Sequence, residues 1–478
     1  MDINEFAERI FLNLPYDPNS QQIELIAALA RFCSDAAPGY PVFLLNGYAG
    51  TGKTSLTGAL VRALHEAGVG TVLMAPTGRA AKVFGRFARQ MATTIHRRIY
   101  RGAESGLAFG GVAEVAENTM VNTVFIVDEA SMIGDGSAME SDGFVSRGSL
   151  LEDLIHYVYS GENCRLILLG DTAQLPPVGC SESPAMNVDV LKSYGLRVSR
   201  AVLTQVVRQQ RMSGVLYNAT WLRKAMLRLP LPEPRISVTR FEDVESVSGE
   251  DLEDKISTAY AESGESDTLL VTRSNKRAVG FNLAIRARIL GREEELCRGE
   301  RLMVAKNNYL WSARVKGLDF VANGDMAEVE YIYGMEEKYG FRFADVRLRL
   351  PDRDISLECK IMLDTLISES AALPRDRICG LYDAALADPD LFTPATPVRT
   401  RMRLLRSDPY VNALQVKYAY AVTCHKAQGG QWSRVFVDMG YIPDEAYRTM
   451  DFYRWLYTAV TRSTSRLYIV NPAEALVR

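Results

Sequence analysis

The sequence predicts an α/β fold built on parallel sheets, with a region of short β-strands inserted in its C-terminal half. Apolar runs at residues 42–45, 124–127 and 166–169 each end in a glycine-rich or polar segment, which is typical of buried parallel strands. A helix-like segment follows the first run. From residue 299 to 362 apolar and polar residues alternate between turn residues, which predicts short half-buried strands instead.

Length and composition limit the class of protein. The chain has 478 residues, which corresponds to about three domains of ~150 residues. Its net charge of −3 excludes a uniformly basic surface but allows a local basic groove. The seven cysteines and four histidines show no metal-ligand spacing, so we expect reduced thiols and a cytoplasmic protein. We expect no signal peptide and no membrane span, because no apolar run reaches ~18 residues.

The first apolar run leads into a phosphate-binding motif. Residues 47–54 read GYAGTGKT, and a helical pattern with one apolar side follows. Backbone N–H groups of such a loop surround phosphate oxygens, and the helix N-terminus adds its positive dipole end. Lys53 reaches the β and γ phosphates in this motif, and Thr54 holds Mg²⁺. We therefore predict ATP and Mg²⁺ as cofactors, with a cradle made of Gly47, Tyr48, Ala49, Gly50, Thr51, Gly52, Lys53 and Thr54.

Polar residues end the next two strands. Asp128 and Glu129 follow residues 124–127, and a carboxylate at this end of a parallel strand faces the ligand crevice. We assign Asp128 to Mg²⁺ through water and Glu129 to the general base that activates the attacking water. Gln174 is placed to sense the γ phosphate. Arg208 is a candidate arginine finger.

These strings resemble the superfamily 1 helicases, in particular the RecD/Dda-like branch (superfamily 1B). The matching segments run in order from Gln22 to Arg462: PNSQQIELIAAL, GYAGTGKT, MAPTGRAAKVF, TTIH, VDEAS, LGDTAQLPPVG, VVRQ, YAVTCHKAQGG and LYTAVTRSTSRLYIV. The resemblance implies two RecA-like P-loop domains with parallel sheets and ATP between them. It also implies a small insertion in the first domain and an SH3-like β-barrel insertion in the second.

Further site residues follow from the resemblance. Gln22 would recognise adenine, and Arg462 would be a finger from the second domain. Gln428, Gly429 and Gln431 would lie at the nucleotide. Gln431 stands where the family often has an acid, so the preference between ATP and dATP stays open. The expected contacts to nucleic acid are Thr77, Arg79, Thr94, His96, Thr423, His425 and Lys426.

Two features of the residues themselves bear on these contacts. Between residues 79 and 101 all charged side chains are positive, which favours contact with phosphates. The adjacent pair Cys424 and His425 resembles a thiolate nucleophile and its base. Neighbours on an extended strand point to opposite faces, so we expect Cys424 in the core and His425, with Thr423, at the nucleic acid.

The predicted boundaries place domain 1A at residues 1–95 and 122–215 and its insertion 1B at 96–121. Domain 2A takes residues 216–297 and 412–478, and insertion 2B takes 298–411. Insertion 1B is interpreted as a strand-separating pin with Leu107 or Phe109 at its tip. Residues 134–150 and 363–396 receive no role.

The leading hypothesis is an ATP-dependent DNA helicase that moves 5′ to 3′ on single-stranded DNA. Its expected partners are single-stranded DNA and forked or tailed duplex DNA, and it is expected to act as a monomer. An RNA helicase is one alternative, because the motifs do not encode a preference for the 2′-hydroxyl. A motor subunit of a RecD-containing nuclease complex is another. The sequence assigns no protein partner.

Overall fold

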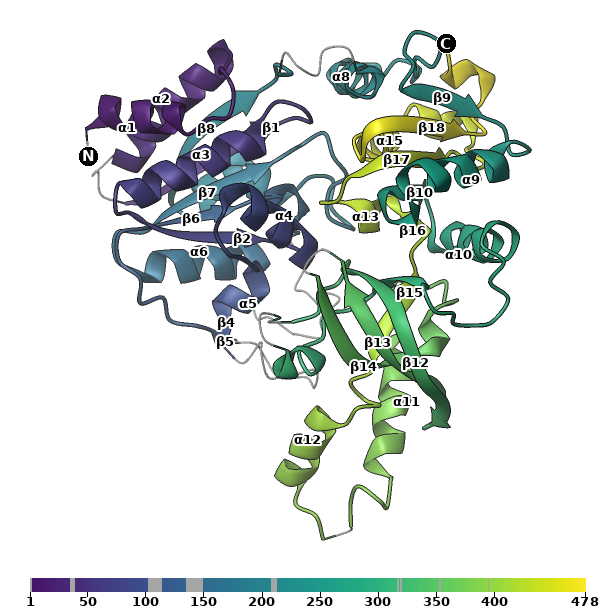
Figure 1. The fold of residues 1–478 in the computed structure, drawn as a ribbon. Helices are drawn as coiled ribbons and strands as arrows, with labels where there is room; N and C mark the ends of the chain where they lie inside the picture. Colours follow the sequence, from purple (N-terminus) through teal and green to yellow (C-terminus); the bar gives the residue numbers. More distant parts are fainter. Residues whose placement is uncertain are drawn as a thin grey trace.

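The protein is built from two parallel sheets and a closed β-barrel (Figure 1). The computed structural model describes residues 2–34, 39–101, 114–134, 149–207, 213–315, 318, 320–351, 354–393 and 395–478. The predicted α/β class with a β-rich insertion is confirmed.

The first sheet has the strand order β3-β2-β6-β7-β1-β8, and its pairs are parallel. Its strands are β1 (Tyr40–Gly47), β2 (Gly70–Ala75), β3 (Ala92–Thr94), β6 (Thr123–Val127), β7 (Arg165–Gly170) and β8 (Leu196–Leu203). Successive residues of β1 belong to different cores: Phe43 and Leu45 to one, Val42 and Leu44 to the other. Both faces are therefore buried, which explains the uninterrupted apolar runs.

Helices cover both faces of this sheet. The helices α1 (Ile3–Leu12), α2 (Ser20–Ser34) and α3 (Lys53–Glu66) share a core with one face, and α6 (Leu150–Ser160) packs on the other (Figure 1). Three further helices are α4 (Gly78–Ala88), α5 (Ile95–Ile99) and α7 (Val188–Ser193). A long connection then leads to the second sheet through α8 (Gly214–Met226).

The second sheet has the order β16-β10-β17-β18-β9, and its pairs are also parallel. Its strands are β9 (Val244–Val247), β10 (Thr268–Thr272), β16 (Ala421–Thr423), β17 (Trp432–Asp438) and β18 (Ser463–Val470). The helices α8 and α15 (Met450–Val460) share a core with one face. The helix α9 (Leu252–Ser263) packs on the other face, and α10 (Asn275–Ala284) follows β10. Two short helices are α13 (Cys424–Ala427) and α14 (Asp444–Tyr447).

The barrel consists of β11 (Arg301–Val304), β12 (Met326–Lys338), β13 (Phe341–Leu350), β14 (Ile355–Met362) and β15 (Leu414–Tyr418). One expectation is corrected here. Residues 412–418 were assigned to the second parallel sheet, but β15 pairs with β11 and β14 and closes the barrel. Burial alternates along β15, so it continues the period-two pattern of the barrel, and only β16 belongs to the parallel sheet. The other predicted domain boundaries stay predictions.

Two helices are inserted between the last two strands of the barrel. They are α11 (Arg375–Leu386) and α12 (Val398–Ser407), and they extend away from both parallel sheets at the bottom of Figure 1. In the first domain, β4 (Tyr100–Arg101) pairs antiparallel with β5 (Glu114–Val115), as at the base of a hairpin. The proposed pin tip, Leu107 or Phe109, lies outside the described residues, as do residues 135–148. Across the part of the chain that the structure describes, no helix has the length and apolarity to span a membrane.

A barrel loop at residues 320–325 contacts both parallel-sheet regions. A Cβ atom on Gly78, the first residue of α4, would lie 2.0 Å from Cβ of Ala322. Lys82 of α4 forms an ion pair with the buried Asp325 at 2.5 Å. On the other side, Lys426 Nζ donates a hydrogen bond to Asn323 Oδ1 at 2.6 Å. The barrel therefore bridges the two halves of the protein.

We predict that Gly78→Ala destabilises the protein by about 1–3 kcal/mol, because the added methyl group overpacks the contact with Ala322. The matched control is Gly280→Ala, also in a helix, where an added Cβ meets no atom within 4 Å. That change should stabilise the protein by up to ~1 kcal/mol through helix propensity. Chemical denaturation measures both, and equal effects of the two substitutions would contradict the close contact.

Candidate nucleotide and nucleic-acid sites

The glycine-rich loop joins the end of β1 to the start of α3, as predicted. Gly52 has φ = 79°, and a Cβ there would lie 2.4 Å from Tyr16 Oη and 2.6 Å from Gln22 Nε2. A Cβ on Gly47 would lie 3.0 Å from Lys53 Cδ. Both positions therefore need glycine, one for its backbone angle and both for close approach.

Gln22 lies directly behind this loop. Its side chain is buried, and its Nε2 donates to the carbonyl oxygen of Thr51 at 3.0 Å. Its Oε1 accepts from the backbone N–H of Asn19 at 3.0 Å. The amide thus supports the loop from below, and its assignment to adenine recognition stays a prediction.

Two buried carboxylates, those of Asp128 and Asp171, interact with the amine of Lys53, and Glu129 lies close to both. Burial raises the pKa of Asp128 to about 6; the charge of Lys53 opposes this effect, and that of Glu129 adds to it. Burial also raises the pKa of Asp171, again opposed by Lys53. Buried carboxylates next to one cation form a site whose charge balance changes when a polyphosphate and a metal ion bind.

Two buried acceptor atoms in this region have no hydrogen-bond partner: Oε2 of Glu129 and Oε1 of Gln174. Glu129 has φ = 53°, the left-handed region that non-glycine residues rarely adopt. Unsatisfied buried acceptors and backbone strain both cost free energy, and they cluster at functional sites. The predicted general base and the predicted phosphate sensor therefore stand in positions that fit a ligand.

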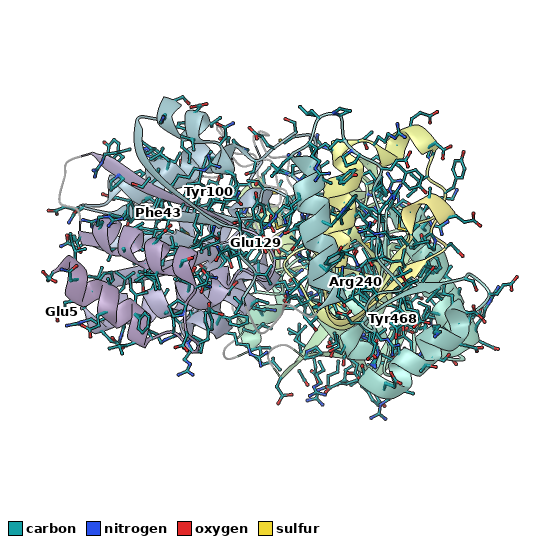
Figure 2. All side chains as sticks on the ribbon, turned by 90° about the horizontal axis from the view of Figure 1, so that it is seen from above. Glu5, Phe43, Tyr100, Glu129, Arg240 and Tyr468 are labelled. Carbon is teal, nitrogen blue, oxygen red and sulfur yellow. The ribbon has the colours of Figure 1, made fainter. Side chains whose placement is uncertain are left out.

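A cavity of about 870 Å³ collects most of the predicted nucleotide-binding residues. It is lined by residues 47–55, Asp128, Glu129, Gln174, Gly429, Gln431 and Arg462. Glu129 lies near the boundary between the two halves of the molecule, with Phe43 and Tyr100 on one side and Arg240 and Tyr468 on the other (Figure 2). Arg208 lies outside the described residues.

Arg462 reaches the cavity from the second sheet region. Its guanidinium is buried and donates to the carbonyl oxygen of Thr458 at 2.9 Å and to that of Gly430 at 3.2 Å. It also donates to Thr461 Oγ1 at 3.0 Å. The candidate finger is therefore held in place by its own domain.

A second cavity, of about 1000 Å³, lies next to the first. Six of the seven predicted nucleic-acid contacts line it: Thr77, Arg79, His96, Thr423, His425 and Lys426. Thr94 does not line it. Its side chain is buried and accepts a hydrogen bond from the backbone N–H of Arg97, so it caps α5. We call this second cavity the groove.

Sequence reasoning missed Arg273, Lys276, Asn307 and Asn323, which also line the groove. Arg273 and Lys276 surround the N-terminus of α10, directly after β10. These two basic residues could have been found from the sequence, because they follow a strand and precede a helix, as the phosphate-binding loop does.

Cys424 and His425 are separated, although not for the predicted reason. Cys424 begins the short helix α13, so the two residues do not lie on an extended strand. Adjacent residues on a helix are rotated by about 100°, which turns Cys424 into the core and leaves His425 in the groove. Burial raises the pKa of the Cys424 thiol to about 12, so the thiolate nucleophile is excluded. Burial lowers the pKa of His425.

Arg79 lines both cavities and crosses from one half of the protein to the other. Its guanidinium lies over the ring of Trp432, 4.2 Å from the centroid. A Cβ on Gly430 would lie 2.7 Å from the Arg79 guanidinium carbon. The glycine therefore makes room for a cation–π contact between α4 and the second sheet.

Tyr457 makes a second contact between the two parallel-sheet regions, which the sequence did not reveal. Its hydroxyl donates to Asp171 Oδ2 at 2.7 Å and accepts from the backbone N–H of Ala49 at 3.0 Å. One buried hydroxyl of α15 thus binds both the phosphate-binding loop and the acid that follows β7.

The segment after β7 is held by two further residues of the second half. Thr458 Oγ1 accepts from the backbone N–H of Leu175 at 2.8 Å. Gln428 Nε2 donates to the carbonyl oxygen of Leu175 at 3.0 Å. Gln428, predicted to lie at the nucleotide, lines the groove instead and fixes this segment.

Comparison with known proteins agrees with this arrangement. The AAA domain family matches residues 19–246, and the UvrD-like helicase C-terminal domain family matches residues 418–470. Together with the relatives described next, these matches make the chain similar to the superfamily 1B helicases of the RecD and Pif1 kind. The first match covers the first parallel sheet and continues through α8 into β9, and the second match covers the strands β16, β17 and β18 of the second sheet.

Two relatives illustrate this family. The ATP-dependent RecD2 DNA helicase of Deinococcus radiodurans is 33% identical over 185 residues, which cover 39% of this chain and only 22% of the relative. The Pif1 helicase from Bacteroides, solved in complex with ADP-AlF3 and ssDNA, has a TM-score of 0.50 at 14% identity. That alignment covers 97% of this chain and 95% of the Pif1 chain, so the two proteins share a fold along nearly their whole length.

We predict that Tyr457→Phe lowers the maximal ATPase rate measured with saturating single-stranded DNA by about tenfold. The phenyl ring still fills the core, but Asp171 and Ala49 lose their shared partner, and a buried charge-assisted hydrogen bond contributes about 1.5–3 kcal/mol.

The matched control is Tyr453→Phe in the same helix, whose hydroxyl donates to the carbonyl oxygen of Pro232. This variant loses one partly buried hydrogen bond away from the cavity, and its turnover should stay near that of the unmodified protein. If both variants lost turnover equally, Tyr457 would serve folding alone.

Proposed function

We propose that this protein is an ATP-dependent DNA helicase that hydrolyses ATP in the 870 Å³ cavity and moves 5′ to 3′ along single-stranded DNA held in the groove. The observation that carries the proposal is that residues of both parallel-sheet regions line both cavities. A change in the separation of the two regions therefore alters both sites at once.

The residues of the first cavity fit nucleotide hydrolysis. The loop amides and Lys53 would bind the phosphates, Oε2 of Glu129 would take a proton from the attacking water, and Oε1 of Gln174 would orient that water. Arg462 would stabilise charge on the transferred phosphoryl group, an effect worth about 10³–10⁵ in rate. Because Arg462 comes from the second sheet region, hydrolysis is linked to domain closure.

Mg²⁺ fits the same cavity. This ion is usually bound by one or two protein groups together with substrate phosphates and water, and the Thr54 hydroxyl and Asp128 carboxylate supply these groups. When bound, it would neutralise charge on the β and γ phosphates.

The groove fits a single strand. Basic residues from α4, α10 and α13 line it together with asparagines, a combination suited to a phosphate backbone without sequence preference. The related Bacteroides Pif1 was crystallised with ssDNA, which supports DNA as the track. The insertion between β4 and β5 is proposed to be the pin that separates the strands.

Two alternatives remain distinguishable by experiment. An RNA helicase would unwind RNA duplexes at least as well as DNA duplexes. A motor subunit of a nuclease complex would hydrolyse ATP with DNA but leave duplexes intact when isolated. Only 22% of the D. radiodurans relative is matched. Under the second alternative, unwinding would require additional domains or subunits.

We expect the isolated chain to unwind a DNA duplex that carries a 5′ single-stranded tail, in the presence of ATP and Mg²⁺. A strand-displacement assay with 5′-tailed, 3′-tailed and blunt duplexes of DNA and RNA measures this, with Lys53→Ala as the inactive control. Preference for the 3′ tail would contradict the direction. Preference for RNA would contradict the track, and hydrolysis without unwinding would favour the subunit.

We predict that Mg²⁺-dependent nucleotide binding weakens as the pH falls through about 6, because the Asp128 pKa of about 6 means that the ligand becomes protonated there. Because the pKa of Asp128 is higher in the folded protein than in the unfolded chain, protonation of Asp128 does not destabilise the fold. Acidification therefore weakens metal binding without lowering the stability contributed by this group.

A fluorescent ADP analogue, titrated between pH 5 and 7.5 with and without Mg²⁺, measures this effect. Asp128→Asn keeps the shape of the side chain and shows the titration of the nucleotide alone. An identical pH profile in this variant and the unmodified protein would contradict the assignment of Asp128.

A further inference from the structure

The helix α12 carries four arginines in ten residues and no acid. Leu405 is buried against Ala385 and Phe392, so it fixes the face of α12 that packs on the extension. At 100° per residue, Arg399, Arg403 and Arg406 lie within about 60° of one another and on the side away from Leu405. All three are exposed.

These three arginines differ from the fourth. Arg401 donates to the carbonyl oxygens of Thr396 and Thr393 and lies over the ring of Phe392. By contrast, Arg399, Arg403 and Arg406 take part in no ion pair within the described ranges. In a protein of net charge −3, three aligned cations without acidic partners form a locally uncompensated surface. We call this surface the arginine stripe.

The extension that carries the stripe is firmly mounted. The Tyr339 hydroxyl donates to Asp388 at 2.7 Å, and Lys338 forms an ion pair with Asp388 at 3.0 Å. These contacts tie the end of the β12–β13 hairpin to the segment between α11 and α12. The stripe therefore has a fixed orientation relative to the barrel.

The extension also begins at the groove. Glu369 and Ala371, which precede α11, line the groove, and Lys417 Nζ donates to the carbonyl oxygen of Ser368 at 2.6 Å. The chain thus runs from the mouth of the proposed single-strand site directly into α11 and α12. The extension that carries the stripe is therefore connected to the groove through the segment that precedes α11.

We propose that the arginine stripe binds the sugar-phosphate backbone of the duplex next to the groove. The stripe runs from Arg399 to Arg406, seven helical steps or about 10 Å along the helix axis, and one strand of duplex DNA presents a phosphate about every 3.4 Å of axial rise. A straight, rigid row of three guanidinium groups matches a rigid duplex, whereas the flexible strand already has a site in the groove. This inference rests on the proposed helicase function. It assigns a binding surface to the duplex part of the substrate, for which the proposed function gives none.

The test compares forked DNA with the single-stranded tail alone, using fluorescence anisotropy between 50 and 200 mM salt. In the triple variant Arg399→Ala/Arg403→Ala/Arg406→Ala, the slope of log K against log salt should fall by about 2–3 for the fork. Over that salt range the unmodified protein should therefore lose about 40-fold more affinity for the fork than the variant does. Binding to the tail and ATPase stimulated by the tail should be unchanged.

Two controls separate charge from structure. Arg31→Ala/Arg228→Ala/Arg235→Ala removes three exposed arginines near α2 and after α8, in the upper part of Figure 1 and away from α12, and should leave fork binding intact. Replacing the three stripe residues by lysine keeps the charge and should retain the salt slope. Alanine is the best helix former, so the variant helix should still form.

An unchanged fork affinity in the triple alanine variant would overturn the proposal, as would an equal loss for fork and tail. An equal loss in the matched control would also overturn it, because net charge alone would then explain the effect. Failure of the unmodified protein to unwind the fork would instead count against the proposed function, since that readout does not involve the stripe variants.

Discussion

Three hydrogen bonds from the second parallel-sheet region hold the segment at residues 171–178 of the first in position. Tyr457 binds Asp171 at its start, and Thr458 and Gln428 bind the two backbone groups of Leu175. This segment places Gln174 in the nucleotide cavity. Three residues later, Pro177 and Val178 line the groove. A single stretch of backbone therefore belongs to both cavities, and the second sheet region holds it.

The free energies of these hydrogen bonds are large enough to couple nucleotide binding to strand binding. A buried hydrogen bond contributes about 0.5–1.5 kcal/mol net, and an acceptor left unsatisfied costs about 1–3 kcal/mol. Allosteric coupling between two sites typically amounts to 1–3 kcal/mol. Breaking or forming two or three of these bonds during domain closure is therefore sufficient to make nucleotide binding and strand binding depend on each other. The contact of Arg79 with Trp432 adds a parallel connection on the other wall.

The residues whose place in the fold could be predicted from sequence are those near the ends of strands. Lys53, Asp128 and Gln174 come within six residues of the end of an apolar strand, and the ends of parallel strands meet at one edge of a sheet, so all three line the same cavity. Tyr457 was missed because a tyrosine within an amphipathic helix has the pattern of a core residue, and its partners lie 286 and 408 positions away. Thr94 was assigned to nucleic acid from its motif, but its hydroxyl caps a helix. The strand β15 was misassigned because strand periodicity alone does not state which sheet a strand joins.

The central claim is that one interface serves both cavities, and linkage tests it most directly. The affinity for single-stranded DNA should be measured with and without a saturating, non-hydrolysable ATP analogue, and the affinity for the analogue with and without DNA. The account predicts that the two ratios are equal and differ from one by at least fivefold, as reciprocal coupling through a shared interface requires. Affinities that do not change in either direction would show that the two cavities act independently and would contradict it.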